Sequence, residues 1–361
     1  MFKKSLVTIA ALGAFAGSAF AGVTLYGTVD GGFQYTNSKV KGEKSESAFK
    51  LADGIGSANK FGIKGEEKIS DDLSVGFKLE NGFHVANGAM KPGVLFDREA
   101  VLYVKSVAGT LAVGREGAIS SGDGMFGQFG SKVAAYSNGR GEVQGMKWTL
   151  AKVDRMNQTL TYESPKFGGV KVLAQYANLN DKQEGHGYVD SKKNNLFYAL
   201  GATYSDDTVY GTALVDVTKK FKAGEKNAVR VSLGGNVKLD GFQVFAAGQY
   251  FKDAPLTVDA LNATALAAKT DVKGFGLNAG VAVPVATGSL KGNLGYMHAK
   301  KAADDKVKLN RFVVGAVYDY PLSKSTFIYS GVGASFEKYK GVEKGKNARS
   351  FAANLGLTHN F

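Results

Sequence analysis

Apolar and polar residues alternate with a period of two along most of the chain, and this feature limits the possible folds most strongly. Near the beginning, apolar or aromatic side chains occupy alternate positions, namely Val23, Leu25, Val29, Phe33 and Tyr35. Residues 350–361 alternate in the same way, except that His359 stands in the apolar set. Successive side chains of a strand point to opposite faces of a sheet. The pattern therefore predicts strands with one apolar face and one polar face.

Two all-β architectures share this alternation. In a soluble sandwich the apolar faces form the core, whereas in a membrane barrel they meet lipid and the polar faces line a water-filled lumen. No apolar run after residue 21 approaches the roughly 20 residues that a membrane-spanning helix needs. The composition, with 48 glycines, 23 phenylalanines, 16 tyrosines and only 5 prolines, also favours sheet over helix or disorder.

The first 21 residues have the features of a secretory signal peptide. Lys3 and Lys4 form a basic start, residues 5–17 are mostly apolar, and Ala19-Phe20-Ala21 provides a cleavage site. The apolar stretch is too short for the alternative, a transmembrane anchor. We expect cleavage after Ala21, which leaves residues 22–361 as one β-barrel domain.

Tight and long connections alternate along the chain. Tight turns are expected at 70–72, 108–109, 165–169, 206–207, 240–241, 284–288 and 321–324. Longer polar connections are expected at 36–56, 118–154, 178–195, 219–227, 253–270, 302–306 and 338–346, with a shorter one at 89–95. Seven hairpins plus the first and last strands give sixteen strands. Short turns on one rim and long loops on the other are typical of outer-membrane proteins. We therefore predict an all-β fold, a sixteen-stranded antiparallel transmembrane β-barrel with short periplasmic turns and long extracellular loops.

The charge balance predicts an anionic partner. The formal net charge is +13, and removal of Lys3 and Lys4 leaves 43 basic residues against 32 acidic ones. Nucleic acid is disfavoured, because the chain is expected to be exported and its charges are scattered rather than gathered in one stripe. Small anionic solutes or lipopolysaccharide fit better. Alternatively, much of the charge lies on the outer loops, where physiological salt screens it over about 8 Å.

Several kinds of chemistry find no support in the sequence. There is no cysteine, and the four histidines are too far apart to form a ligand pair, so we expect no metal site and no cofactor. The glycine-rich fragment 331–333 lacks the helix that a phosphate-binding loop requires. No motif brings serine, histidine and carboxylate together, so we expect that the protein is not an enzyme.

Seven stretches, in chain order, resemble the Gram-negative porin family, particularly the porins of beta-proteobacteria. They are VTLYGTVDGGF at 23–33, FGIKGEE at 61–67, LENGF at 79–83, REAVLYV at 98–104, GTLAVGRE at 109–116, NQTLTYESPKFGG at 157–169 and LGLTHNF at 355–361. The resemblance implies a channel in the cell outer membrane, built as a homotrimer of sixteen-stranded barrels. It also implies that the third long loop, residues 117–154, folds inward and constricts the pore. The alternative is an ordinary external loop, although about 38 residues far exceed the usual 2 to 5 of a hairpin.

The resemblance further implies a basic cluster on the pore wall opposite acidic groups on the inward loop. The matching basic positions are Lys60, Arg98 and Arg155, with Arg115 at the start of the loop. Strand parity independently places Lys60 opposite the outward Phe61, and places Arg155 on the face of Thr159, Thr161 and Glu163. Arg98 depends on the resemblance alone.

The acidic side of this constriction is weaker than in family members with a clear acidic pair. Glu116 and Asp123 are the early carboxylates of the loop, and Glu142 and Asp154 follow later. We therefore expect a pore field dominated by cations, which favours anions.

The terminal Phe361 resembles the signal that the outer-membrane assembly machinery reads. The alternative is that Phe361 is an ordinary aromatic residue of the interfacial girdle, and the two roles are compatible.

The function predicted from these features is passive diffusion of small hydrophilic solutes and ions, with a preference for anions. A substrate-specific channel is the first alternative, and aromatic residues of the long loop could line its track: Phe126, Phe129, Tyr136 and Trp148. A barrel that serves as an adhesin or a structural protein is the second alternative, and it would need no open pore.

Overall fold

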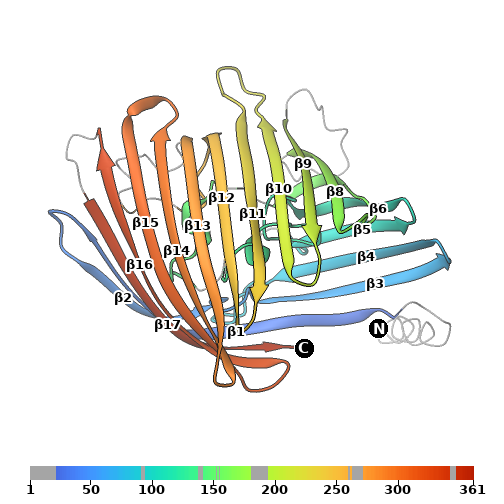
Figure 1. Ribbon diagram of the computed structural model, residues 1–361, viewed down its shortest axis with the longest axis horizontal. Helices are drawn as coiled ribbons and strands as arrows, with labels where there is room; N and C mark the ends of the chain where they lie inside the picture. The colour runs from blue at the N-terminus through green and yellow to red at the C-terminus, as the bar shows by residue number, and fades with distance from the viewer. Residues whose placement is uncertain are drawn as a thin grey trace, which may run out of the picture.

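The computed structural model of the protein describes residues 22–90, 94–136, 141–151, 153, 155–179, 194–258, 261, 271–341 and 347–361. The expected signal peptide, residues 1–21, and Asp154 lie outside these ranges. No helix within them is long and apolar enough to cross a membrane. The strands form one closed antiparallel β-barrel (Figure 1).

Each strand pairs with its neighbours in chain order, and the last strand pairs with the first. The strand segments are β1 (Thr24–Val40), β2 (Glu46–Asp53), β3 (Lys60–Ser70), β4 (Leu73–Gly82), β5 (Glu99–Ser106), β6 (Gly109–Gly117), β7 (Arg155–Glu163), β8 (Val170–Leu179), β9 (Asn195–Ser205), β10 (Val209–Lys219), β11 (Ala228–Leu239), β12 (Phe242–Ala254), β13 (Val272–Val285), β14 (Gly288–Lys301), β15 (Asp304–Pro321), β16 (Thr326–Lys340) and β17 (Asn347–Asn360).

Two of these segments are halves of a single barrel strand. β2 pairs with Gly31–Ser38 of β1, and β3 pairs with Thr24–Thr28 of the same strand. The chain between them, residues 54–59, leaves the ladder and returns to it. The barrel therefore has sixteen strands, and the predicted number and antiparallel order are confirmed.

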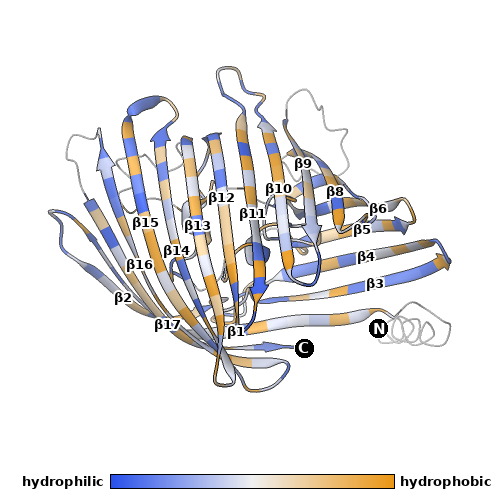
Figure 2. Cartoon of the chain, in the orientation of Figure 1, coloured by the Kyte–Doolittle hydropathy of each residue, from blue (hydrophilic) through white to orange (hydrophobic). Residues whose placement is uncertain are grey.

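The outward faces of the strands are apolar, as a lipid-facing surface requires. Figure 2 shows hydrophobic and hydrophilic residues alternating along the strands. Leu233, Leu277 and Leu355 are 57%, 53% and 54% exposed, whereas inward polar residues such as Thr161 and Ser335 are fully buried. A soluble sandwich would bury the leucines instead. This distribution distinguishes the membrane barrel from the sandwich.

Short turns and long connections separate onto two rims, with two corrections to the expected loops. Only residues 302–303 separate β14 from β15, so the longer connection expected at 302–306 is a tight turn. β1 continues to Val40 and β2 begins at Glu46, so the expected loop at 36–56 is mostly strand. Polar side chains pair across this hairpin, since Asn37 Nδ2 donates to Ser45 Oγ and to Ser47 Oγ at 2.8 Å each. Near Asn37 and Ser45 both faces of the hairpin are hydrophilic, so the sequence lacks the alternation of a strand and was predicted as a loop.

The described residues of the connection between β6 and β7 lie inside the barrel. We call residues 118–136 and 141–151 the inner segment; it contains the 3₁₀ turns η2 (Gly130–Lys132) and η3 (Met146–Thr149). Its side chains Ile119, Val133 and Met146 are fully buried and pack in one cluster with wall residues of β5–β10 and β12, among them Leu173 and Phe197. The main apolar core of the protein is therefore enclosed by the barrel rather than formed between sheets.

Asp30 of β1 holds the break between β2 and β3. Its carboxylate, fully buried, accepts hydrogen bonds from the backbone N–H groups of Ile55 at 2.7 Å, Gly56 at 3.1 Å and Ser57 at 3.1 Å. Tyr329 also donates its hydroxyl to Asp30, at 3.0 Å. Three orphaned backbone donors in the break thus share one acceptor.

Replacing Asp30 with alanine should lower the stability of the folded barrel by about 3 kcal/mol, because buried donors would lose their acceptor. The urea midpoint of the protein in lipid vesicles, followed through the fluorescence of the single tryptophan, measures this change. Asp207→Ala, in an exposed turn, is the matched control. Equal midpoints for the two variants would show that the network does not stabilise the break.

Candidate pore wall

A cluster of charged side chains lies on the inward face of β3–β5, and its centre is Glu80. The Glu80 side chain is 3% exposed, and Arg98 donates Nε to its Oε1 at 2.6 Å. Lys60 Nζ and Lys78 Nζ lie 3.6 Å and 3.8 Å from Glu80 Oε2. Two of the predicted wall residues, Lys60 and Arg98, are therefore close together and bind the same carboxylate.

A second carboxylate joins this cluster to the inner segment. Glu99 is buried; it pairs with Lys78, and its Oε1 accepts a hydrogen bond from the backbone N–H of Met125 at 2.6 Å. The wall and the beginning of the inner segment are thus held together by a charged group. A hydrogen bond to a carboxylate is stronger than one between neutral groups.

Tyr26 of β1 completes the cluster. Its hydroxyl donates to Glu80 Oε2 at 3.0 Å, and Lys64 Nζ and Lys78 Nζ lie 5.4 Å and 6.0 Å from the centre of its ring. We call this set the Glu80 cluster: Tyr26, Lys60, Lys64, Lys78, Glu80, Arg98 and Glu99. It holds four cationic groups and two carboxylates, so two positive charges are in excess.

Several members of the Glu80 cluster were absent from the sequence prediction, although the sequence carried a signal for two of them. Lys78 and Glu80 alternate with the apolar Phe77 and Leu79, so parity alone places them on the inward face. The sequence analysis made no prediction for Tyr26. Nothing in the residues around Tyr26 indicates that its side chain contacts β4.

The structure does not bring Arg115 into the Glu80 cluster. Arg115 pairs in register with Ala100, and Val113 on the same face is outward and 45% exposed. The guanidinium donates from Nε to the backbone oxygen of Asp97 at 2.8 Å and also bonds Asn157. This position is at the rim, outside the basic group formed by Lys60 and Arg98.

Arg155 and Asp123, predicted on opposing sides of the constriction, form an ion pair with 3.0 Å between Nη2 and Oδ1. Arg155 lines a cavity together with the buried Met156 and Phe197, although the β6–β7 register shifts between Gly114 and Glu116. Gln158, with a φ of 52°, lies in the same irregularity.

Glu116 lies in the wall rather than on an open acidic surface. It is fully buried, and its Oε1 accepts hydrogen bonds from Thr161 and, at 3.2 Å, from Gln175 Nε2. Among the described part of the inner segment, the remaining carboxylates are the paired Asp123 and the exposed Glu142.

The inner segment, which was predicted to carry the acidic groups of the constriction, also carries two lysines. Lys147 donates to the backbone oxygen of Gly141 at 3.1 Å, and Lys132 donates to the backbone oxygen of Gly127 at 2.8 Å. Burial lowers the pKa of both lysines. The inner segment therefore offers little negative charge to oppose the Glu80 cluster.

A buried ion pair holds the end of the inner segment against the opposite wall. Arg311 and Glu337 are fully buried, with 2.7 Å between Nε and Oε1. Arg311 Nη1 donates to the backbone oxygens of Trp148 at 2.9 Å and Val258 at 3.1 Å. Val258 belongs to the β12–β13 connection, which the sequence predicted as an external loop, so its described residues near Val258 also turn inward.

The C-terminal residue closes the barrel. The backbone N–H of Phe361 donates to the oxygen of Gly27 at 3.1 Å, and Gly27 N–H donates back at 3.0 Å. The Phe361 side chain is 53% exposed. The ring is therefore accessible on the finished barrel while the backbone is fixed to β1.

Nearly the whole chain is similar to known proteins. Residues 8–358 match the family model described as Gram-negative porin. An outer membrane porin protein of Bordetella pertussis is 26% identical over 99% of this chain and 100% of its own length. The major outer membrane protein P.IB of Neisseria sicca is also 26% identical, with the same coverage of both chains.

Solved structures share the fold at lower sequence identity. An anion-selective porin from Comamonas acidovorans superposes with a TM-score of 0.65 at 22% identity, over 94% of this chain and 100% of that one. The trimer form of OmpT from Vibrio cholerae superposes with a TM-score of 0.61 at 13% identity, over 95% of this chain and 100% of that one. The family match spans nearly all of a closed sixteen-stranded barrel. This chain therefore belongs to the Gram-negative porins and is an outer-membrane channel protein.

Proposed function

We propose that this porin passes small hydrophilic solutes by passive diffusion and prefers anions, and that the Glu80 cluster sets the preference. The observation that carries the proposal is the excess of cations around Glu80 and Glu99 on the inward face of β3–β5. The similarity to a porin described as anion-selective supports it. We infer no catalytic role, because the charged groups of the cluster are engaged with one another.

The size of the expected preference follows from the charge count. A unit charge 8 Å from a passing ion in water contributes about 0.5 kcal/mol, and salt at physiological strength reduces this roughly threefold. Two excess charges attract an anion and repel a cation, so the electrostatic interaction energies of the two ions differ by about 0.7 kcal/mol. This corresponds to a permeability ratio of roughly three. The proposal is therefore a moderately selective, general-diffusion pore.

The inner segment, within the predicted constricting loop 117–154, is proposed to narrow this pore. Support comes from its contacts with the wall: Thr149 and Trp148 lie against β13 and β15, and Gln144 Nε2 donates to Ser350 Oγ of β17 at 3.0 Å. Open space for solutes would then remain beside β3–β5, next to the Glu80 cluster.

A homotrimer is proposed as the working assembly, and the trimer form of the Vibrio cholerae relative supports it. The assembly-signal role of Phe361 remains a proposal as well; it is supported by the exposed ring at the C-terminus.

Replacing Lys60, Lys64 and Arg98 together with glutamine should shift the selectivity towards cations, because the two carboxylates would then outnumber the remaining lysine. The reversal potential in a planar bilayer with a salt gradient measures this shift. The control Lys166→Gln, Lys238→Gln, Lys324→Gln removes the same charge at exposed positions near the short-turn rim. An unchanged reversal potential in the cluster variant would place the selectivity elsewhere.

Replacing Gly276 with alanine should lower the single-channel conductance. A Cβ at Gly276 would lie 1.8 Å from the backbone oxygen of Thr149, so the inner segment must move away from the wall, towards the lumen. Gly211→Ala in β10 is the control, because no atom lies within 4 Å of its added Cβ. Equal conductance in the two variants would argue against a constricting role for the segment.

The conductance of the natural protein should rise nearly in proportion to salt concentration and should appear in groups of three steps. Proportionality distinguishes a diffusion pore from a substrate-specific channel, whose sites saturate. Saturation at low salt would favour the specific channel. No conductance from folded protein would favour an adhesin or structural role.

A further inference from the structure

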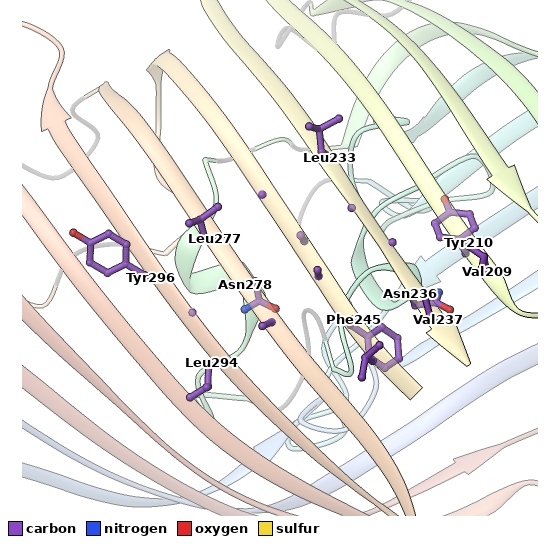
Figure 3. A pocket seen from close by; sticks show the side chains of 18 of the residues that line it. Val209, Tyr210, Leu233, Asn236, Val237, Phe245, Leu277, Asn278, Leu294 and Tyr296 are labelled. Carbon is purple, nitrogen blue, oxygen red and sulfur yellow. The ribbon is translucent and has the colours of Figure 1, made fainter. Parts of the chain in front are cut away.

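Two hollows in the described part of the barrel differ in the molecules that they suit. The larger, about 780 Å³, lies on the outward face between β10 and β15; Figure 3 shows Leu233, Leu277 and Leu294 around it. No charged residue lines this hollow, so it suits the hydrocarbon around the barrel rather than a water-soluble solute. The smaller, about 280 Å³, is lined by charged and apolar side chains together.

The smaller hollow lies inside the barrel, at the long-loop ends of β7–β11. Phe197 and Arg230, which line it, are almost completely buried. Residues next to two inward-turning connections line it as well, namely Val153 before β7, and Pro255 and Asp271 between β12 and β13. We call this hollow the rim cavity; its lining includes Arg155, Met156, Phe197, Lys220, Arg230 and Asp271.

The charged part of the rim cavity is mainly cationic. Three cations line it, and each forms an ion pair: Arg155 with Asp123 at 3.0 Å, Arg230 with Asp216 at 2.7 Å, and Lys220 with Asp271. Among these described carboxylates, only Asp271 lines the cavity; the other two contact their arginines from outside it. A molecule in the cavity therefore meets three positive groups and one negative group.

The three cations keep hydrogen-bond donors beyond their ion pairs. A guanidinium has five N–H donors and an ammonium has three. Arg155 donates from Nη2 to Asp123, whereas its buried Nε has no acceptor in the described part of the chain. Arg230 directs Nε to Asp216 and Nη2 to Thr218, and Lys220 directs its ammonium to Asp271. The remaining donors suit a carboxylate, which accepts several hydrogen bonds at once.

Most of the other lining residues are apolar. Met156 and Phe197 are 6% and 1% exposed, and Val153, Leu179 and Pro255 also line the cavity. Such a surface adds no affinity for a small hydrated inorganic ion, but it removes an apolar ligand surface from water. A cavity with cations on one part of its lining and apolar side chains on another therefore suits an anion with an apolar body.

The rim cavity is connected to the Glu80 cluster through the beginning of the inner segment. Asp123 pairs with Arg155 of the cavity, and the backbone N–H of Met125 donates to Glu99 of the cluster. Only Gly124 separates these two residues. The cavity therefore lies beside the proposed path of anions, on its long-loop side.

We propose that the rim cavity binds small organic carboxylates with an apolar body before they pass the Glu80 cluster. The carboxylate accepts hydrogen bonds from Arg155 and Lys220, and the apolar body packs against Met156 and Phe197. A volume of about 280 Å³ suits a ligand of about ten non-hydrogen atoms. This inference rests on the proposed anion-preferring pore and names a class of solute that the pore serves.

The first test compares three ligands on the purified protein in detergent, by isothermal titration calorimetry. Phenylacetate should bind at least about tenfold more tightly than acetate, which has the charge without the ring. It should exceed phenylethylamine, which has the ring with the opposite charge, by at least the same factor. Equal affinity for acetate would show that the apolar lining is not used, and equal affinity for phenylethylamine would show that the cations are not used. Either result would overturn the proposal.

The second test locates the bound phenylacetate. Lys220→Gln should weaken its binding at least about tenfold, because one charged donor is lost while Asp271 stays beside the ligand. Lys219→Gln is the matched control, since it removes the same charge at the adjacent, exposed position outside the cavity. Arg155→Gln should weaken binding to a similar extent, so the test does not depend on the folding of one variant. Natural affinity in Lys220→Gln or in Arg155→Gln would contradict the proposed site.

Failure of this inference is distinguishable from failure of the pore proposal. The variant Lys60→Gln, Lys64→Gln, Arg98→Gln should bind phenylacetate as the natural protein does, because none of these residues lines the rim cavity. Natural binding together with an unchanged reversal potential would contradict only the role of the Glu80 cluster. A shifted reversal potential without any phenylacetate binding to the natural protein would contradict only the rim cavity.

Discussion

The structure depends on closure of the sheet between β1 and β17. These strands pair from Thr28 with Asn360 to Val40 with Ala348, and the pairing leaves the barrel without a free edge. Inside a bilayer no water is available for unpaired backbone groups, and each such group costs several kcal/mol. Among β-sheets, only a closed barrel satisfies all of them. The position of Phe361, bonded to Gly27, follows from this requirement.

Closure of the barrel creates an interior that is lined by polar side chains. The inner segment lies in this interior, and most of its residues are buried from water. The inner segment forms an apolar cluster around Ile119 and Met146, and two of the buried arginines of the wall form ion pairs. Arg230 with Asp216 at 2.7 Å and Arg311 with Glu337 illustrate this pairing. Breaking such a pair leaves an uncompensated buried charge, so these contacts fix where the segment lies. Where the segment lies determines which wall is left beside the pore.

The same residue type has different consequences on the two faces of the barrel. On the inward face, Lys60 and Lys78 surround a buried carboxylate, and the small excess of charge acts on ions in the lumen. On the outward face, Lys300 and Lys308 pair in register across β14 and β15, near the exposed rings of Tyr296 and Phe312. Side-chain parity on the strands decides between these environments, because adjacent residues point to water and to lipid in turn.

The sequence by itself determined the class of fold, the number of strands and the face of most side chains. The alternation of Phe61 with Lys60, or of Phe351 with Ser350, is local and needs no knowledge of the rest of the chain. The tertiary structure alone decided which inward residues meet. Glu80 gathers Lys60 and Arg98, Glu116 is buried against Thr161, and Arg115 stays at the rim, because strand register and bulges set these contacts. The paths of the inner segment and of residues 54–59 depend on hydrogen-bond partners far away in the chain, which no local pattern reveals. Arg311 donates to the backbone oxygen of Trp148, and Asp30 accepts from the backbone N–H of Ile55.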